Sequence, residues 1–173
     1  MKLTDSAGRA QIVFGGLALL LALGAIGSAW GFQLIGGYVP CALCLEQREP
    51  YYLGIPILLL AVILTIAKPH LWLVRLLYVA FAIVIAYGFY LAVYHAGAEW
   101  ELWLGPSDCG GTPAVLTDTT DLLAQLETVK IISCTEAAAR FLGLSFAGWN
   151  AVATLVLAVL GLLAAFSSAN KEA

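Results

Sequence analysis

The sequence has little charge. Only 11% of its 173 residues are charged, against about 25% in an ordinary soluble domain. Lys and Arg together number eight against eleven Asp and Glu and form no basic stripe, which excludes nucleic-acid binding as the main function. Cysteine is scarce as well, because four cysteines are too few to stabilise so long a chain as a secreted disulfide scaffold, although they suffice for redox chemistry. Hydrophobic residues make up 62% of the chain, and this composition predicts an integral membrane protein.

Four apolar segments are long enough to cross a bilayer, which takes about 20 residues. They lie at residues 12–35, 51–67, 76–94 and 149–166. The second contains Pro56, which predicts a kink. We therefore expect an all-α fold, a four-helix transmembrane bundle that forms a single integral membrane domain over residues 1–173.

The distribution of positive charge predicts the orientation of the bundle. Five of the eight Lys and Arg residues lie in the two termini and the short second loop, and three are spread over the two longer loops. The positive-inside rule then places both termini in the cytoplasm and directs the loops at about residues 36–50 and 97–148 outward. An alternative for the first span is a cleaved signal peptide, because residues 27–29 are small, although the apolar run continues beyond them.

The long outward loop contains a helical pattern of its own. Leu122, Leu123, Leu126 and Val129 fall on one face of a helix. Such a short amphipathic helix would either rest at the membrane interface or pack on its own loop, and the sequence leaves both open.

The first outward loop contains a Cys-X-X-Cys unit, Cys41 and Cys44, a spacing that lowers the pKa of a thiol. Pro40 predicts that a helix begins here and carries both cysteines in its first turns. Arg48 would then lie on the same face, one turn further along, where its charge favours a thiolate. The alternative is an arginine that only marks the end of a span, but charged groups at membrane depth usually serve a site.

The second outward loop contains the other two cysteines. Cys109 lies in an exposed segment rich in Gly and Pro, and Cys134 lies between Ser133 and Glu136, which have the spacing of a capping box. This predicts a short helix that begins at Cys134 and ends at Gly143. A purely structural disulfide is one alternative for this pair. A four-cysteine zinc site is another, but these two cysteines lack the close spacing that such sites use, so we expect no metal.

Taken together, these residues resemble the DsbB family, the bacterial inner-membrane proteins of disulfide bond formation. The resemblance lies in CALCLEQR at residues 41–48, in a second cysteine pair in a long loop, and in SCTEAAARFLGL at residues 133–144 with Trp149 after it. It implies a four-helix bundle in the inner membrane, with the cysteine loops in the periplasm. It also implies an enzyme that reoxidises a periplasmic DsbA-like thioredoxin-fold protein and passes the electrons to a membrane quinone, ubiquinone or menaquinone.

The resemblance also implies a route for the electrons. The partner attacks a Cys109–Cys134 disulfide and forms a mixed disulfide with Cys109. Cys134 is thereby freed and attacks Cys41. Cys44 is left as a thiolate beside the quinone, where Arg48 stabilises negative charge.

His95 is predicted at the outward end of the third span, near the position of a family histidine thought to contact the quinone. A histidine that is only hydrogen-bonded at the membrane interface is an equally good interpretation. Two other functions stay open on the sequence alone. One is a quinone-linked oxidoreductase similar to vitamin K epoxide reductase, and the other is a non-enzymatic membrane subunit with structural disulfides.

Overall fold

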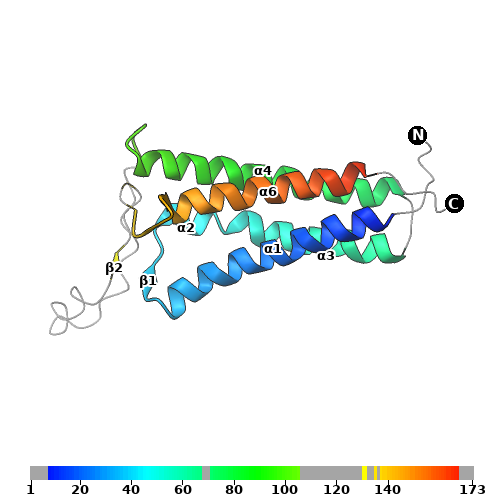
Figure 1. The fold of residues 1–173 in the computed structure, drawn as a ribbon, viewed down its shortest axis with the longest axis horizontal. Helices are drawn as coiled ribbons and strands as arrows, with labels where there is room; N and C mark the ends of the chain where they lie inside the picture. The colour runs from blue at the N-terminus through cyan, green and yellow to red at the C-terminus, as the bar shows by residue number, and fades with distance from the viewer. Residues whose placement is uncertain (1–7, 68–70, 106–129, 132–134, 136, 168–173) are drawn as a thin grey trace.

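Four long helices run side by side in the computed structural model, which describes residues 8–67, 71–105, 130–131, 135 and 137–167. They are α1 (Arg9–Leu34), α3 (Glu49–Ala67), α4 (Leu71–Glu99) and α6 (Phe146–Phe166), and each is long and apolar enough to cross a membrane (Figure 1). The predicted four-helix architecture is confirmed. The third helix is longer than the predicted segment at both ends, so His95 lies inside α4 rather than at its end.

The centre of the bundle is filled by large side chains that meet glycines on neighbouring helices. Phe81 of α4 is fully buried. A Cβ atom added to Gly161 of α6 would lie 2.9 Å from the Phe81 ring, and one added to Gly54 of α3 would lie 3.3 Å from it. Small residues of this kind let helix backbones approach closely inside a membrane. Many large apolar side chains on the outer faces are exposed, as expected where lipid surrounds a bundle.

The connection from α1 to α3 is structured, and it carries the first cysteine pair. It consists of β1 (Tyr38–Val39) and the five-residue helix α2 (Ala42–Glu46), and α3 starts at Glu49 after a turn. The predicted helix start at Pro40 was therefore two residues early, because Cys41 is the N-cap and the first helical residue is Ala42. Pro50 lies in the first turn of α3, where a missing N–H is tolerated.

Part of the long loop pairs with this connection. The strand β2 (Lys130–Ile131) lies parallel to β1, with Val39 opposite Ile131. In Figure 1 the strands β1 and β2 lie with α2 at one end of the bundle, the end at which α1 finishes and α6 begins. The opposite end carries the start of α1 and the finish of α6.

The short helix predicted to end at Gly143 is not formed in the described residues 137–143. Two strands stand in its place, β3 (Arg140–Phe141) and β4 (Leu144–Ser145), which pair antiparallel. Leu142 and Gly143 between them both have positive φ, 51° and 86°, which is the conformation of a two-residue hairpin turn. Gly143 therefore marks a hairpin and not a helix end. The amphipathic pattern at residues 122–129 lies outside the described residues.

Candidate functional site

Cys41 and Cys44 are held by the first turn of α2. The backbone N–H of Cys44 donates a hydrogen bond of 3.2 Å to the Cys41 sulfur, which thereby caps the helix. Both cysteines are free thiols, and they differ in access because Cys41 is fully buried whereas Cys44 is only half-buried. The hydrogen bond to the Cys44 sulfur, together with burial, raises the pKa of the Cys41 thiol.

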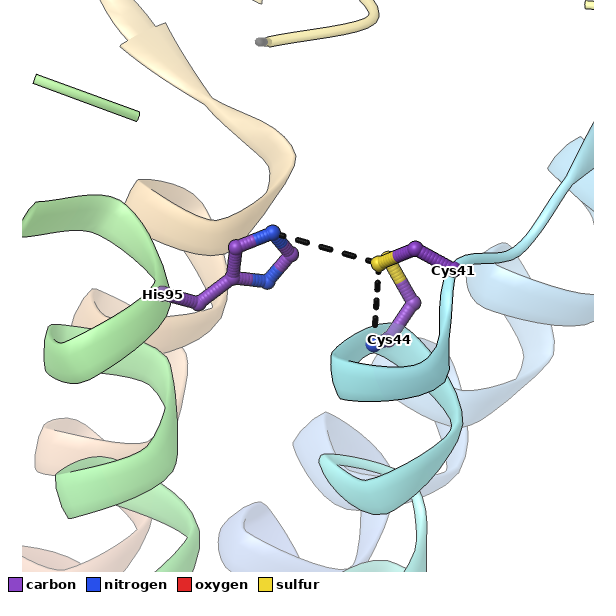
Figure 2. A group of neighbouring side chains, drawn as sticks. All are labelled: Cys41, Cys44 and His95. Carbon is purple, nitrogen blue, oxygen red and sulfur yellow. Dashed lines mark hydrogen bonds between the residues drawn. The ribbon is translucent and has the colours of Figure 1, made fainter. Parts of the chain in front are cut away.

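His95 reaches this pair from another helix. Its Nε2 lies 4.0 Å from the Cys41 sulfur, and its side chain is buried with 2% of its surface exposed. Figure 2 shows the imidazole of α4 pointing across to the two sulfurs at the start of α2. Bundle packing thus brings together residues that are 54 positions apart in the sequence.

A group of amides that the sequence analysis missed lies behind the imidazole. Gln47 donates from its Nε2 to Nδ1 of His95 at 2.7 Å and to the carbonyl of Leu43 at 3.2 Å. Asn150 of α6 donates from Nδ2 to Oε1 of Gln47 at 2.7 Å, and the Tyr51 hydroxyl donates to Oδ1 of Asn150 at 2.7 Å. Asn150 could have been identified from the sequence, because it is a polar residue within a predicted apolar span.

Glu99 is a second missed residue. It lies one helical turn after His95, with 3.8 Å between Nε2 of His95 and Oε1 of Glu99. The hydroxyl of Ser145 donates to Oε2 of Glu99, and Nη2 of Arg140 donates to the Glu99 backbone carbonyl at 3.5 Å. The clue in the sequence was the i, i+4 spacing of a histidine and a glutamate near a helix end.

Arg48 is buried against α1 and does not extend to solvent. Its Nη1 donates to Oε1 of Gln33 at 2.5 Å, its Nη2 donates to the carbonyl of Ala29 at 3.4 Å, and its guanidinium lies 5.4 Å from the centre of a Trp30 ring. The prediction that Arg48 shares one helix face with the cysteines was wrong, because α2 ends at Glu46 and the chain turns before α3. Its charge makes only a small contribution at the sulfur of Cys44, after the hydrogen bonds with Cys41, burial and the charge of Glu99.

Three atoms of the site have a spacing that a metal ion could bridge. The sulfurs of Cys41 and Cys44 and a ring nitrogen of His95 lie within 4.8 Å of one another. A histidine that binds a metal through one nitrogen normally donates a proton from the other. Here Nδ1 accepts a hydrogen bond from Gln47, so the proton belongs on Nε2, the nitrogen that faces the sulfur. The donor set is not organised for a metal ion, and we assign none to it.

The other two predicted site residues, Cys109 and Cys134, lie outside the described residues. The described strand β2 does lie close to Cys134 in the sequence, and it pairs with β1. Ile131, three positions before Cys134, has its backbone beside Val39, two positions before Cys41. The structure thus ties the long loop to the first cysteine pair through the backbone.

The geometry can now be compared with known proteins. A family model described as "Disulfide bond formation protein DsbB" matches residues 11–164, nearly the whole chain. The chain belongs to the DsbB family. Membership in the DsbB family implies a membrane oxidoreductase that takes part in disulfide bond formation. With the four apolar helices, it indicates a multi-pass protein of the inner membrane.

One curated relative is also similar. An uncharacterized protein of Rickettsia prowazekii (strain Madrid E) is 25% identical over 150 residues, which cover 85% of this chain and 84% of the relative. No solved structure matches the chain significantly.

Proposed function

We propose that this protein reoxidises a periplasmic DsbA-type thioredoxin-fold protein and passes the electrons to a membrane quinone. The electrons would enter at a Cys109–Cys134 disulfide, move to Cys41 and Cys44 by thiol–disulfide exchange, and leave to the quinone. The observation that carries this proposal is the construction of the Cys41–Cys44 pair. One of its sulfurs is buried next to two hydrogen-bond donors, and the other is more accessible.

The exchange step between the two cysteine pairs is supported by the backbone pairing of the two loops. Exchange requires that an attacking thiolate reach a disulfide sulfur. The parallel pairing of Tyr38 with Lys130 and of Val39 with Ile131 holds the segment before Cys134 against the segment before Cys41. A soluble partner would exchange with Cys109, which the sequence places in a Gly- and Pro-rich segment of the loop.

The surroundings of the dithiol fit a quinone. Tyr94 packs against the buried Cys41 and Leu43, and with Tyr90, Val93 and Trp103 it also lines an open surface pocket of about 210 Å³. Apolar and aromatic walls with a few polar groups are typical of sites for small organic cofactors. When bound, a quinone supplies an acceptor for two electrons and two protons.

Three residues would act on the acceptor. Cys44 offers the accessible sulfur, and Arg48 offers a positive charge that is held in place from α1. His95 offers a ring N–H beside the sulfurs, at 4.0 Å from Cys41. The positive charge of Arg48 favours a thiolate on Cys44 and would also favour negative charge that develops on an acceptor oxygen.

The orientation in the membrane is part of the proposal. We infer that the end of the bundle with α2 and the short strands faces the periplasm and that both termini are cytoplasmic. Positive charge supports this orientation, because Arg9 begins α1 and Arg75 lies near the start of α4. Lys2, Lys68 and Lys171 lie close to the same helix ends in the sequence. Figure 1 places the start of α1 and the finish of α6 together at the end opposite α2.

The proposal is tested by quinone reduction with the purified full-length protein in detergent and a reduced DsbA-type protein as donor. Ubiquinone and menaquinone analogues are compared, and the Cys44→Ser and Cys109→Ser variants are assayed beside the wild type. We expect partner-dependent reduction in the wild type and loss of it in both variants. A folded wild-type protein that reduces neither quinone with several such donors would overturn the proposal and favour cysteines that are purely structural.

A further inference from the structure

A single chain of hydrogen bonds leads from Tyr51, in the first turn of α3, to the Cys41 sulfur. It passes through Tyr51, Asn150, Gln47 and His95, and we call these four residues the polar chain. The four residues come from three helices and the turn before α3, so the chain forms only when the bundle is assembled. Its last contact is the 4.0 Å approach of His95 Nε2 to Cys41.

Each residue of the polar chain donates a hydrogen bond to the next one, and Gln47 determines this direction of donation. The carbonyl of Leu43 can only accept a hydrogen bond, so the Gln47 atom that faces it at 3.2 Å must be the NH₂ group. The same NH₂ group lies 2.7 Å from Nδ1 of His95, and its second hydrogen points there. The amide oxygen of Gln47 is in turn occupied by the NH₂ group of Asn150.

This direction determines which ring nitrogen of His95 carries the proton. Because Nδ1 accepts from Gln47, it has no hydrogen, and the neutral ring must be protonated at Nε2. Nε2 faces the Cys41 sulfur at 4.0 Å and Oε1 of Glu99 at 3.8 Å, and both are acceptors when charged. An imidazolium would need a second hydrogen on Nδ1, where it would meet the Gln47 NH₂ group.

We propose that Gln47 and Asn150 are positioning residues that hold His95 as the neutral Nε2–H tautomer, so that His95 donates a hydrogen bond to the Cys41 sulfur whenever Cys41 is released as a thiolate. This deepens the proposed function and rests on it for the exchange reaction. The arrangement of the proton itself does not depend on that reaction and can be measured separately.

The chemistry that needs this donor is the breaking of a disulfide at Cys41. When a thiolate attacks the sulfur that is disulfide-bonded to Cys41, a new S–S bond forms and the bond to Cys41 breaks. The electron pair of the broken bond stays on the Cys41 sulfur. A better leaving thiolate leaves faster. Two donors then meet the sulfur, the N–H of Cys44 at 3.2 Å and Nε2–H of His95 at 4.0 Å. Their combined effect compensates for the burial of a charge where Cys41 is fully enclosed.

The other charged and titratable groups around His95 come from every element that packs on it. They are the two cysteines of the first loop, Glu99 on its own helix, Tyr51 at the far end of the polar chain on α3, and Arg140, which binds the Glu99 carbonyl from β3. Negative charge on Cys41 and Glu99 would draw a second proton to His95. The NH₂ group of Gln47 opposes this, and this opposition is the function we assign to it.

The first test reads the tautomer directly by ¹⁵N NMR of the full-length protein in detergent, labelled at histidine. The chain has two histidines, so a His70→Asn variant identifies the His95 signals. We expect the signature of a neutral ring protonated at Nε2. In Gln47→Glu, where a carboxylate faces Nδ1, we expect a shift to the Nδ1–H or doubly protonated ring. A wild-type ring protonated at Nδ1 would overturn the proposal, whatever the activity of the protein.

The second test is the pH profile of partner oxidation in Gln47→Glu, divided by that of the wild type. At low pH the variant imidazole carries both protons and still donates from Nε2. As the pH rises and the ring loses one proton, the proton on Nδ1 is kept by the glutamate, and Nε2 becomes a lone pair that repels the thiolate. The relative rate should therefore fall as pH rises, by an amount on the order of tenfold for one lost hydrogen bond to a charged group.

Two further variants separate positioning from folding. Asn150→Asp keeps the shape of the side chain but removes the donor to Gln47. Like Gln47→Glu, it should therefore favour a His95 ring protonated at Nδ1, although Asn150 acts on His95 only through Gln47. Gln11→Glu is the matched control, because Gln11 is a buried glutamine in the first turn of α1. That helix starts at the end of the bundle opposite α2 (Figure 1). The control should leave both the NMR signals and the pH profile unchanged. The positioning role would be overturned if Gln47→Glu lowered the rate of partner oxidation equally at every pH and left the ¹⁵N signals of His95 unchanged. Gln47 would then serve only in packing.

Discussion

Nη1 of Arg48 donates a hydrogen bond of 2.5 Å to Oε1 of Gln33, so α1 holds the guanidinium in a fixed position. Arg48 follows Cys44 by four residues, yet its side-chain contacts are with a different helix. The arginine therefore has a defined position before any acceptor binds. A preorganised charge stabilises developing negative charge without further rearrangement.

Arg48→Ala should weaken quinone reduction while the fold stays largely intact. The variant loses the positive charge and leaves Gln33 without its partner, so we expect roughly a tenfold loss in kcat/KM and a small drop in melting temperature. Arg48→Lys is the informative companion, because a lysine has no planar fork to bind Gln33 and the Ala29 carbonyl together. If Arg48→Ala reduced quinone with normal rate and affinity, the proposed role of Arg48 would be wrong.

Cys41→Ser and Cys41→Ala should both abolish turnover but differ in stability. The Cys41 sulfur caps α2 by accepting from the N–H of Cys44. A serine oxygen can accept that bond, whereas an alanine cannot, and the loss of an N-cap costs about 1 kcal/mol. Thermal unfolding of the two variants under reducing conditions measures the difference. Equal stability of the two variants would contradict a capping role for the sulfur.

Ser145→Ala should destabilise the end of the bundle that carries α2. Ser145 caps α6 by accepting from the N–H of Gly148 at 3.1 Å, and its hydroxyl also donates to the buried Glu99 carboxylate. We expect a loss of about 1–3 kcal/mol in the free energy of unfolding, measured by denaturant or thermal unfolding. Ser145→Thr, which keeps the hydroxyl, is the control.

The coupling between these two residues can be isolated. In a double-mutant cycle with Glu99→Gln, the effects of the two substitutions should be less than additive, because each removes part of the same hydrogen bond. Strict additivity would show that Ser145 and Glu99 do not depend on each other.

Gly97→Ala should displace Trp103. A Cβ atom at Gly97 would overlap the indole ring of Trp103, which stacks on Tyr94 with 6.2 Å between ring centroids and donates from Nε1 to the Tyr94 carbonyl at 2.8 Å. We expect a red shift of tryptophan emission, a lower melting temperature and weaker quinone affinity, because Trp103 is a wall of the open pocket that it shares with Tyr94. Gly24→Ala, where nothing lies within 4 Å of the added atom, should do none of these. An unchanged emission spectrum in Gly97→Ala would contradict the close contact.

Much of the fold was predictable because it depends on local composition. A run of about 20 apolar residues has to form a helix in a membrane, since no water is present to satisfy its backbone groups. The four spans follow from that requirement, and the structure differs from the prediction mainly at their ends. The hairpin at residues 140–145 was mistaken for a helix because Gly143 suits a helix end and a hairpin turn equally well.

The sequence by itself determined the class of the protein, its four spans and the reactive spacing of Cys41 and Cys44, since these depend on residue type and on short separations along the chain. Only the tertiary structure decided what surrounds the sulfurs. In the folded protein Arg48 donates to Gln33 on α1, His95 lies against Cys41, and Gln47 donates to the other ring nitrogen of His95. These contacts join residues that are 15 to 54 positions apart, and their partners depend on how the helices rotate and cross when they pack. Which ring nitrogen of His95 carries the proton is therefore a property of the assembled bundle, because it depends on hydrogen bonds that no single segment can form.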